Sequence, residues 1–401
     1  MDANFNLKQR NAGLLAFSLS GVCAISSSIV VSLLQESYGF AYGMTGTLLS
    51  LMSIGNLISG FLTGFLPSKI GTRLTVTILT AGYAIGYLVM GLSGWMTVLM
   101  ISFLLVGLAK GCTLNTCTIL VGDNSPDRTR GMNIMHACYA CGALLSPFFI
   151  AAAAKAGSFI PMFLLSAFGL ILWMTFLLTP MGAADNGRES GHVKEQAQNT
   201  ARRKGSDRER AKGRTDWSFL RSRKFWLLTG LIFCQNAAEY SVNGWMVTYF
   251  KGSGIISGAF STYTVTVMWA ATLLGRLLIA FVFPVKDACR AMIRMSLGCI
   301  VFYLGLMLVH SQTPAVVMLL LFAFSMAGMN PTAVAGAGRM TSAASIGVML
   351  PVAGIGAVVM PWIAGLISEQ VSLAAGMASN IVPCVGLLVF AMLVNRVREE
   401  D

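Results

Sequence analysis

The sequence predicts an all-α membrane protein with twelve transmembrane helices in two six-helix halves. Three observations lead to this prediction. Hydrophobic residues make up 55% of the 401 residues and charged residues only 11%, whereas soluble domains carry roughly 25% charged residues. Apolar runs of about 20 residues, each long enough to cross a bilayer core as a helix, recur along almost the whole chain. A long polar and basic segment separates the first six runs from the last six.

The twelve apolar runs are the expected membrane spans. In chain order they cover residues 12–35, 44–67, 73–93, 96–120, 131–153, 158–179, 224–250, 257–283, 288–310, 313–336, 341–368 and 372–395. The segment between the sixth and seventh runs contains RRKGSDRERAKGR and has too few apolar residues to form a packed core. We therefore expect an N-terminal six-helix bundle over 1–182, a basic cytoplasmic linker over 183–223 and a C-terminal six-helix bundle over 224–401.

Lysine and arginine collect in the loops of one side of the predicted bundle. Most of the 28 Lys and Arg residues fall in alternate loops, in the linker and at the two termini. The positive-inside rule then places both termini in the cytoplasm. Because topology accounts for the net charge of +12, no nucleic acid partner is expected. We expect a monomer in the cytoplasmic membrane, surrounded by the lipid bilayer.

The sequence lacks the usual patterns of an enzyme or a metal protein. It has no phosphate-binding loop with a P-loop lysine, no metalloprotease motif and no nucleophile elbow. Its nine cysteines are scattered without the spacing of a metal site, and we interpret them as small packing residues. We therefore expect no catalytic residue, no metal and no cofactor.

Glu239 is the acidic residue that the sequence places deep in a span. It lies near the middle of the run 224–250, in the stretch CQNAAEYSVNGW. Positions 235, 239 and 243 follow one another at four-residue steps and so share one helix face. Amides, a carboxylate and an aromatic ring suit sugar hydroxyls and C–H faces, whereas interhelical packing is the alternative role. The predicted substrate-binding residues of this stretch are Gln235, Asn236, Glu239, Asn243 and Trp245.

Lys110 is a second charged residue within a predicted span. It lies in FLLVGLAKGCTLNT, near the middle of the run 96–120 and among small residues. A charged side chain at the centre of a bilayer costs about 2.5–3.5 kcal/mol or more, so such residues are usually functional. Asn115 and Asn330 also fall within spans and complete the predicted substrate-binding set. The pair Asn330-Pro331 is expected to break its span and free backbone groups near a cavity.

Two motifs resemble the major facilitator superfamily. GFLPSKIGTR, residues 64–73, is similar to the family's G-x-x-x-D-R/K-x-G-R-R/K loop after the second span, although Ser68 stands where the family usually has aspartate. The ion pairs of that loop are therefore expected to be weaker or made differently. RTRGMNIMHACYACGALLSPFF, residues 128–149, resembles the start of span five in the fucose-permease-like sugar transporters. The matching positions of the two motifs are Gly64, Lys69, Gly71, Arg73, Arg130, Asn133, His136, Gly142, Ala143 and Pro147.

The resemblance implies a major facilitator fold in which spans one, four, seven and ten line a central cavity. Lys110 and Glu239 would then face the same cavity. Lys110 would pair with Glu239 in the empty site, bind an anionic substrate, or form a purely structural ion pair. Arg276 is interpreted as either structural or functional, and His136 as a packing or gating hydrogen bonder. The resemblance assigns Gly64, Lys69, Gly71, Arg73 and Arg130 to the gating loops.

Together these features predict a secondary active transporter that imports a small polar solute by proton-coupled alternating access. A sugar or sugar derivative is the expected small-molecule substrate, and Glu239 is the expected proton-coupling residue. Fucose permease has carboxylates in the middle of spans one and four, and this chain has none there. The alternatives are a transporter of an organic anion that uses Lys110, and a proton-driven exporter of drugs or metabolites.

Overall fold

The computed structural model describes residues 6–180, 218–282, 285, 287–340 and 343–399, and within these ranges the chain is helical, with no strand. The first part of the chain forms a group of helices that we call the N-terminal group. Its members are α1 (Leu7–Tyr38), α2 (Tyr42–Phe65), α3 (Pro67–Ile70), α4 (Thr72–Leu92), α5 (Met96–Asp123), α6 (Arg128–Ala154) and α7 (Ile160–Leu178).

The second part of the chain forms the C-terminal group, preceded by the 3₁₀ turn η2 (Ser218–Arg221). Residues 183–217 of the predicted linker lie outside the described ranges. The C-terminal group consists of α9 (Arg223–Ser253), α10 (Gly258–Ser261), α11 (Thr264–Phe281), α12 (Ala288–Leu308), α13 (Gln312–Met326), α14 (Met329–Met340), α15 (Ala343–Gly354), α16 (Gly356–Gln370), α17 (Leu373–Ala378) and α18 (Ile381–Glu399).

The last three predicted spans each contain a break that divides them into two helices. In the tenth span, α13 ends before Gly328 and α14 begins at Met329. Pro331 lies in the first turn of α14, where a missing N–H group is tolerated. In the eleventh span, Ile355 separates α15 from α16 and has a glycine on each side. The break near Asn330-Pro331 was expected from the sequence, whereas the other two were not.

The described helices include ten segments that are long and apolar enough to cross a membrane, and α11 contributes a shorter apolar helix. At 31 residues, α9 is also long enough to cross a membrane. It is absent from those ten because the polar stretch around Glu239 lowers its mean hydropathy. The twelve predicted spans therefore all correspond to helices of an all-α, multi-pass membrane protein.

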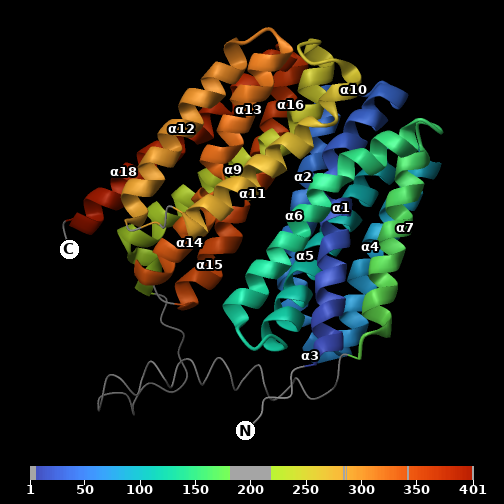
Figure 1. Cartoon of the computed structure of the whole chain (residues 1–401), viewed down its shortest axis with the longest axis horizontal. Helices are drawn as coiled ribbons and strands as arrows, with labels where there is room; N and C mark the ends of the chain where they lie inside the picture. The colour runs from blue at the N-terminus through green and yellow to red at the C-terminus, as the bar shows by residue number, and fades with distance from the viewer. Residues whose placement is uncertain (1–5, 181–217, 283–284, 286, 341–342, 400–401) are drawn as a thin grey trace.

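The two groups lie side by side and meet most closely at one end, the upper end of Figure 1. There the Lys251 ammonium lies 2.9 Å from the Glu36 carboxylate, and the Gly43 amide donates to Glu369 Oε2 at 2.9 Å. Further in, the Ser50 hydroxyl donates to the Val358 carbonyl at 2.6 Å. We call this the closed end. The opposite end, where α1 begins and α3 lies, is called the open end, and the sequence predicts that it faces the cytoplasm.

Small residues allow α2 and α16 to approach closely at the closed end. A Cβ atom on Gly46 would lie 2.6 Å from the Pro361 carbonyl oxygen and 3.1 Å from the Gly365 Cα atom. Both neighbours are backbone atoms, so a side chain at position 46 would force the helices apart. Glycine at this position is therefore required by packing between the two groups.

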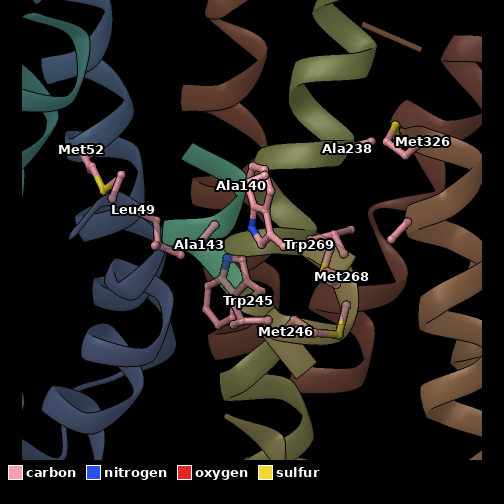
Figure 2. Close-up of a cluster of buried hydrophobic side chains, with 14 of the residues drawn as sticks. Leu49, Met52, Ala140, Ala143, Ala238, Trp245, Met246, Met268, Trp269 and Met326 are labelled. Carbon is pink, nitrogen blue, oxygen red and sulfur yellow. The ribbon is translucent and has the colours of Figure 1, made fainter. Parts of the chain in front are cut away.

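A second contact between the groups joins α6 and α11. From the middle of the molecule toward the closed end, Tyr139 packs on Trp269, Thr266 donates to the Leu144 carbonyl at 3.0 Å, and Phe148 packs on Tyr263. The buried hydrophobic side chains around this contact come from both groups (Figure 2), with Leu49, Met52, Ala140 and Ala143 from the N-terminal group near Trp245 and Trp269 from the C-terminal group. This apolar layer separates the closed end from the space below it.

Candidate functional site

A cavity of about 260 Å³ lies between the two groups, below the apolar layer. We call it the central cavity. Its walls come from α1, α2, α5 and α6 on one side and from α9, α11, α14 and α16 on the other. Its polar and charged lining residues are Ser20, Ser27, Ser28, Ser53, Lys110, His136, Tyr139, Asn236, Glu239, Tyr240, Asn243, Trp269, Arg276 and Asn330.

Glu239 lines the central cavity from α9 and belongs to a hydrogen-bonded chain of side chains. The Gln235 amide donates to Glu239 Oε2. The Asn330 amide of α14 in turn donates to Gln235 Oε1 at 2.7 Å. Gln235 is itself fully buried and is not part of the cavity wall. It therefore orients the carboxylate, while Asn330 and Glu239 both reach the cavity.

Asn236 and Asn243 line the same wall and use their amide nitrogens on backbone carbonyls. Asn236 Nδ2 donates to the Ala353 carbonyl at 3.1 Å, and Asn243 Nδ2 donates to the Glu239 carbonyl at 2.8 Å. These bonds define which end of each amide is the nitrogen. The two amide oxygens consequently remain as acceptors for hydrogen-bond donors in the cavity.

Besides Gln235, two more predicted substrate-binding residues lie away from the cavity wall. Trp245 is fully buried, and its indole N–H donates to the Pro361 carbonyl at 3.0 Å. Asn115 donates to the Thr63 hydroxyl of α2 at 2.7 Å. In this conformation both residues make contacts that hold helices of the same group together.

Lys110 reaches the central cavity from α5, opposite the polar face of α9. Its ammonium lies 4.7 Å from the centre of the Tyr240 ring, a cation–π contact between the two groups. Within the described part of the chain no ion pair of 4.0 Å or less joins Lys110 to Glu239. The interpretation in which Lys110 pairs with Glu239 in the empty site therefore does not describe this conformation.

Arg276 lines the cavity from α11 and is held by the break in the tenth span. Its Nε donates to the Ala327 carbonyl at 3.3 Å. In an unbroken helix that carbonyl would accept from the amide of residue 331, but Pro331 has no N–H group. The proline thus frees the acceptor that positions Arg276, which agrees with the sequence expectation that this break frees backbone groups near a cavity.

Two aromatic residues that the sequence did not single out as a pair form the upper wall of the cavity. Tyr139 and Trp269 pack edge to face across the two groups, with ring centroids 5.6 Å apart. Trp269 also borders a side cavity of about 10 Å³, together with Glu239, Asn243 and Arg276. Their sequence positions carry no recognisable signal, because each becomes part of the site only through a neighbour on another helix.

The remaining polar lining is either satisfied locally or exposed. The Ser27 and Ser28 hydroxyls donate to carbonyls of their own helix, at Ala24 and Ile25. His136 is exposed at the open-end side of the cavity, with its ring 5.7 Å from that of Phe17. These residues add polarity to the wall without forming a network around Glu239.

The predicted gating residues lie at the open end, away from the cavity. Gly64 has no neighbour within 4 Å of a Cβ position, and Gly71 has a φ of 83°, a conformation that glycine adopts readily. The Lys69 ammonium lies over the Phe65 ring at 4.4 Å, and Arg73 donates to the Leu177 carbonyl at 2.8 Å. The Arg130 amide is capped by Asp127.

Ser68 stands where the family usually has aspartate. Its side chain is uncharged and cannot form an ion pair that would link this loop to the C-terminal group. Its hydroxyl donates to the Phe65 carbonyl at 2.7 Å. The bond of Arg73 to Leu177 likewise stays within the N-terminal group. In this conformation the described contacts of the loop stabilise one group of helices and leave the open end unlinked through this loop.

Comparisons with known proteins agree with the architecture. The profile of the Major Facilitator Superfamily matches residues 12–350. A crystal structure of the nucleoside transporter NupG superposes with a TM-score of 0.70 at 15% identity, covering 98% of both chains. A bacterial homologue of the human lysosomal transporter Spinster, in an inward-facing and unoccupied conformation, gives 0.73 at 16% identity, again covering 98% of both chains. At these identities the likeness shows the fold alone. The search of curated proteins found no match.

Proposed function

Because the chain belongs to the Major Facilitator Superfamily and is a transporter rather than an enzyme, we propose that it moves a small polar solute across the cytoplasmic membrane by coupling it to a proton. Glu239 carries the proton in this proposal. The protein works as a monomer, and the solute enters the central cavity when one end of the molecule is open.

The observation that supports this proposal is the position of Glu239. Its carboxylate lines the cavity between the two groups and is held by Gln235, which is held in turn by Asn330. An ionised carboxylate resists enclosure in a membrane protein, because it loses its hydration. Protonation removes the charge, so the cavity can close around a protonated Glu239 more easily than around an ionised one.

The two ends of the interface support alternating access as the mechanism. The closed end is joined by contacts between α2 and α16 and between α6 and α11, whereas His136 and Leu114 on the open-end side of the cavity are exposed. Transport requires a second state in which the closed end separates and the open end closes. Parallel six-helix repeats with a site between them work in this way.

A sugar or sugar derivative is the solute that the sequence favours, through its resemblance to the fucose-permease-like branch. The amide oxygens of Asn236 and Asn243 can accept hydrogen bonds from sugar hydroxyls, and the Tyr139 and Trp269 rings offer apolar faces. The cavity of about 260 Å³ has room for a small polar solute.

Uptake into proteoliposomes tests the proposal. The purified protein is first screened by thermal shift against D-glucose, L-fucose, uridine, D-glucuronate and L-lactate, and the stabilising solute is then used for transport. We expect an inward proton gradient to drive accumulation of that solute. Glu239→Gln should abolish gradient-driven accumulation but retain exchange of labelled for unlabelled solute, because exchange needs no net proton movement.

Asp127→Asn is the matched control, since it removes a carboxylate at an exposed N-cap where asparagine caps equally well. It should leave accumulation unchanged. Accumulation that ignores the proton gradient, or that survives in Glu239→Gln, would show that Glu239 does not couple transport to protons.

A further inference from the structure

The central cavity carries more positive than negative charge. Lys110 and Arg276 reach it from opposite groups of helices, and Glu239 is the carboxylate in its wall. Among the residues that the structure describes, neither Lys110 nor Arg276 takes part in an ion pair of 4.0 Å or less. Lys110 contacts the Tyr240 ring, and Arg276 donates its Nε to one backbone carbonyl.

Two unpaired cations at this depth are unusual for a membrane protein. Charged side chains within spans normally pair with one another or face a water-filled cavity, because their desolvation is costly. Lys110 keeps three N–H donors, and Arg276 keeps the donors of its two terminal nitrogens. The cavity therefore offers a concentration of charged donors without a matching set of acceptors from the protein.

Trp269 adds a donor of the same kind. Its side chain is 9% exposed, and its indole N–H has no acceptor within the described residues. Trp269 borders both the central cavity and the side cavity that it shares with Arg276. A buried indole N–H normally finds a partner, so this donor points independently to an acceptor that is supplied from outside the chain.

The α9 wall of the cavity presents acceptors. Asn236 and Asn243 give their N–H groups to backbone carbonyls and leave their amide oxygens for a ligand. These oxygens suit hydroxyl groups, which donate one hydrogen bond each. Charged donors and amide acceptors in one small cavity match a molecule that has both a carboxylate and hydroxyl groups.

We propose that the central cavity binds a small hydroxylated carboxylate, such as a sugar acid, whose charge is offset by Lys110 and Arg276 and whose hydroxyls bond to Asn236 and Asn243. The inference rests on the proposed function and specifies its solute. It also gives Arg276, which the sequence left between a structural and a functional role, a direct part in binding.

The bound anion and the proton on Glu239 assist one another. An anion near the two cations lowers the positive charge that otherwise repels a proton from Glu239, and by linkage a protonated Glu239 repels the anion less. The titratable groups that share the cavity with Glu239 are Lys110, His136, Tyr139, Tyr240 and Arg276.

D-Glucose and D-glucuronate form a matched pair of probes, because they share a ring and differ in one carboxylate. Affinities are measured by thermal shift and calorimetry on the purified full chain. We expect D-glucuronate to bind about 10- to 100-fold more tightly than D-glucose, the range that one charge-assisted hydrogen bond of about 1.5–3 kcal/mol provides.

Lys110→Gln and Arg276→Gln should each weaken D-glucuronate binding by about tenfold or more and weaken D-glucose binding less, because D-glucose has no carboxylate for the cations to offset. Glutamine at 276 retains an N–H donor for the Ala327 carbonyl, and Arg276→Lys, which retains the charge, should preserve most of the preference. Lys155→Gln and Arg294→Gln remove exposed charges outside the cavity and serve as matched controls without effect.

Glu239→Gln imitates the protonated side chain and removes a negative charge from the cavity wall, so it should strengthen the binding of D-glucuronate. Equal binding of D-glucose and D-glucuronate, or binding of neither, would overturn the inference. So would a preference for D-glucuronate that survives in both Lys110→Gln and Arg276→Gln.

The outcomes separate this inference from the proposed function. Proton-driven uptake of D-glucose without a preference for D-glucuronate keeps the coupling role of Glu239 and refutes the anion site. Tight binding of D-glucuronate whose uptake ignores a proton gradient keeps the anion site and refutes the coupling.

Discussion

The closed end and the central cavity are two parts of one interface, and different forces act in them. At the closed end, backbone atoms of α2 and α16 approach closely at Gly46 and Gly365, and few side-chain hydrogen bonds join the groups. In the cavity, charged and amide side chains face each other across open space. We infer from this difference that close backbone packing stabilises the closed end, whereas charged and amide side chains set the chemistry of the cavity.

Gly46→Val should break the closed end and is the largest effect expected. Overpacking costs about 1–3 kcal/mol, which would shift the balance between closed and separated states by about 5- to 150-fold. Spin labels at positions 38 and 253, in a background without the nine native cysteines, would report a longer distance. Gly60→Val, on the same helix with no neighbour within 4 Å, is the matched control. An unchanged distance in Gly46→Val would show that packing at this glycine does not hold the closed end.

Trp245→Phe tests whether the hydrogen bond between α9 and α16, within the C-terminal group, stabilises the fold. The substitution leaves the buried Pro361 carbonyl without its indole donor, which costs about 1–3 kcal/mol. We expect the apparent thermal midpoint to fall by about 2–6 °C, with little change in solute affinity. Trp95→Phe, at a side chain that is 79% exposed, should leave the midpoint unchanged. A loss of affinity larger than the loss of stability would return Trp245 to the substrate-binding set.

Lys251→Met should have the smallest effect of these substitutions. It compares a charge at the closed end with the charges of the central cavity. The side chains of this pair are 15% exposed at Lys251 and 54% exposed at Glu36, so water reaches the pair, and ion pairs at the surface contribute about 0–1 kcal/mol and are screened by salt. Transport should change by less than about fivefold, and raising the ionic strength should remove the difference. Lys155→Met controls for the loss of a positive charge on the same side. A defect as large as that of Lys110→Gln would mean that this exposed ion pair holds the closed end.

The helices of the N-terminal group follow the sequence closely, because each apolar run there forms one long helix. Glu239 and Lys110 were likewise found from the sequence, since an ionisable residue within an apolar span is conspicuous wherever its neighbours lie. The fold and the two central charges therefore depend on local patterns that a sequence displays directly.

Helix geometry explains the residues whose predicted role the structure does not support in this conformation. Trp245 is six residues from Glu239, so at 100° per residue it points about 120° away from the carboxylate. Asn115 is five residues from Lys110 and points about 140° away. Membership in the same polar stretch was a weaker guide than angular position on the helix.

The role of Arg276 depended on a relationship between helices. Pro331 indicates that the Ala327 carbonyl is free, but the sequence does not show which side chain reaches it. Tyr139 and Trp269 meet only because α6 and α11 pack together near the middle of the molecule. Features of this kind become visible once the packing of the two groups is known.

The breaks in the C-terminal group distinguish its helices from those of the N-terminal group. The spans of the N-terminal group are continuous helices, whereas the tenth, eleventh and twelfth spans of the C-terminal group are each divided, the first two of them at Ala327–Gly328 and at Ile355. A cavity side chain bonds to the backbone at each of these two breaks. Arg276 donates to the Ala327 carbonyl, and Asn236 donates to the Ala353 carbonyl. A ligand that bonds to Arg276 or Asn236 would therefore contact side chains that also hold the backbone at these two breaks.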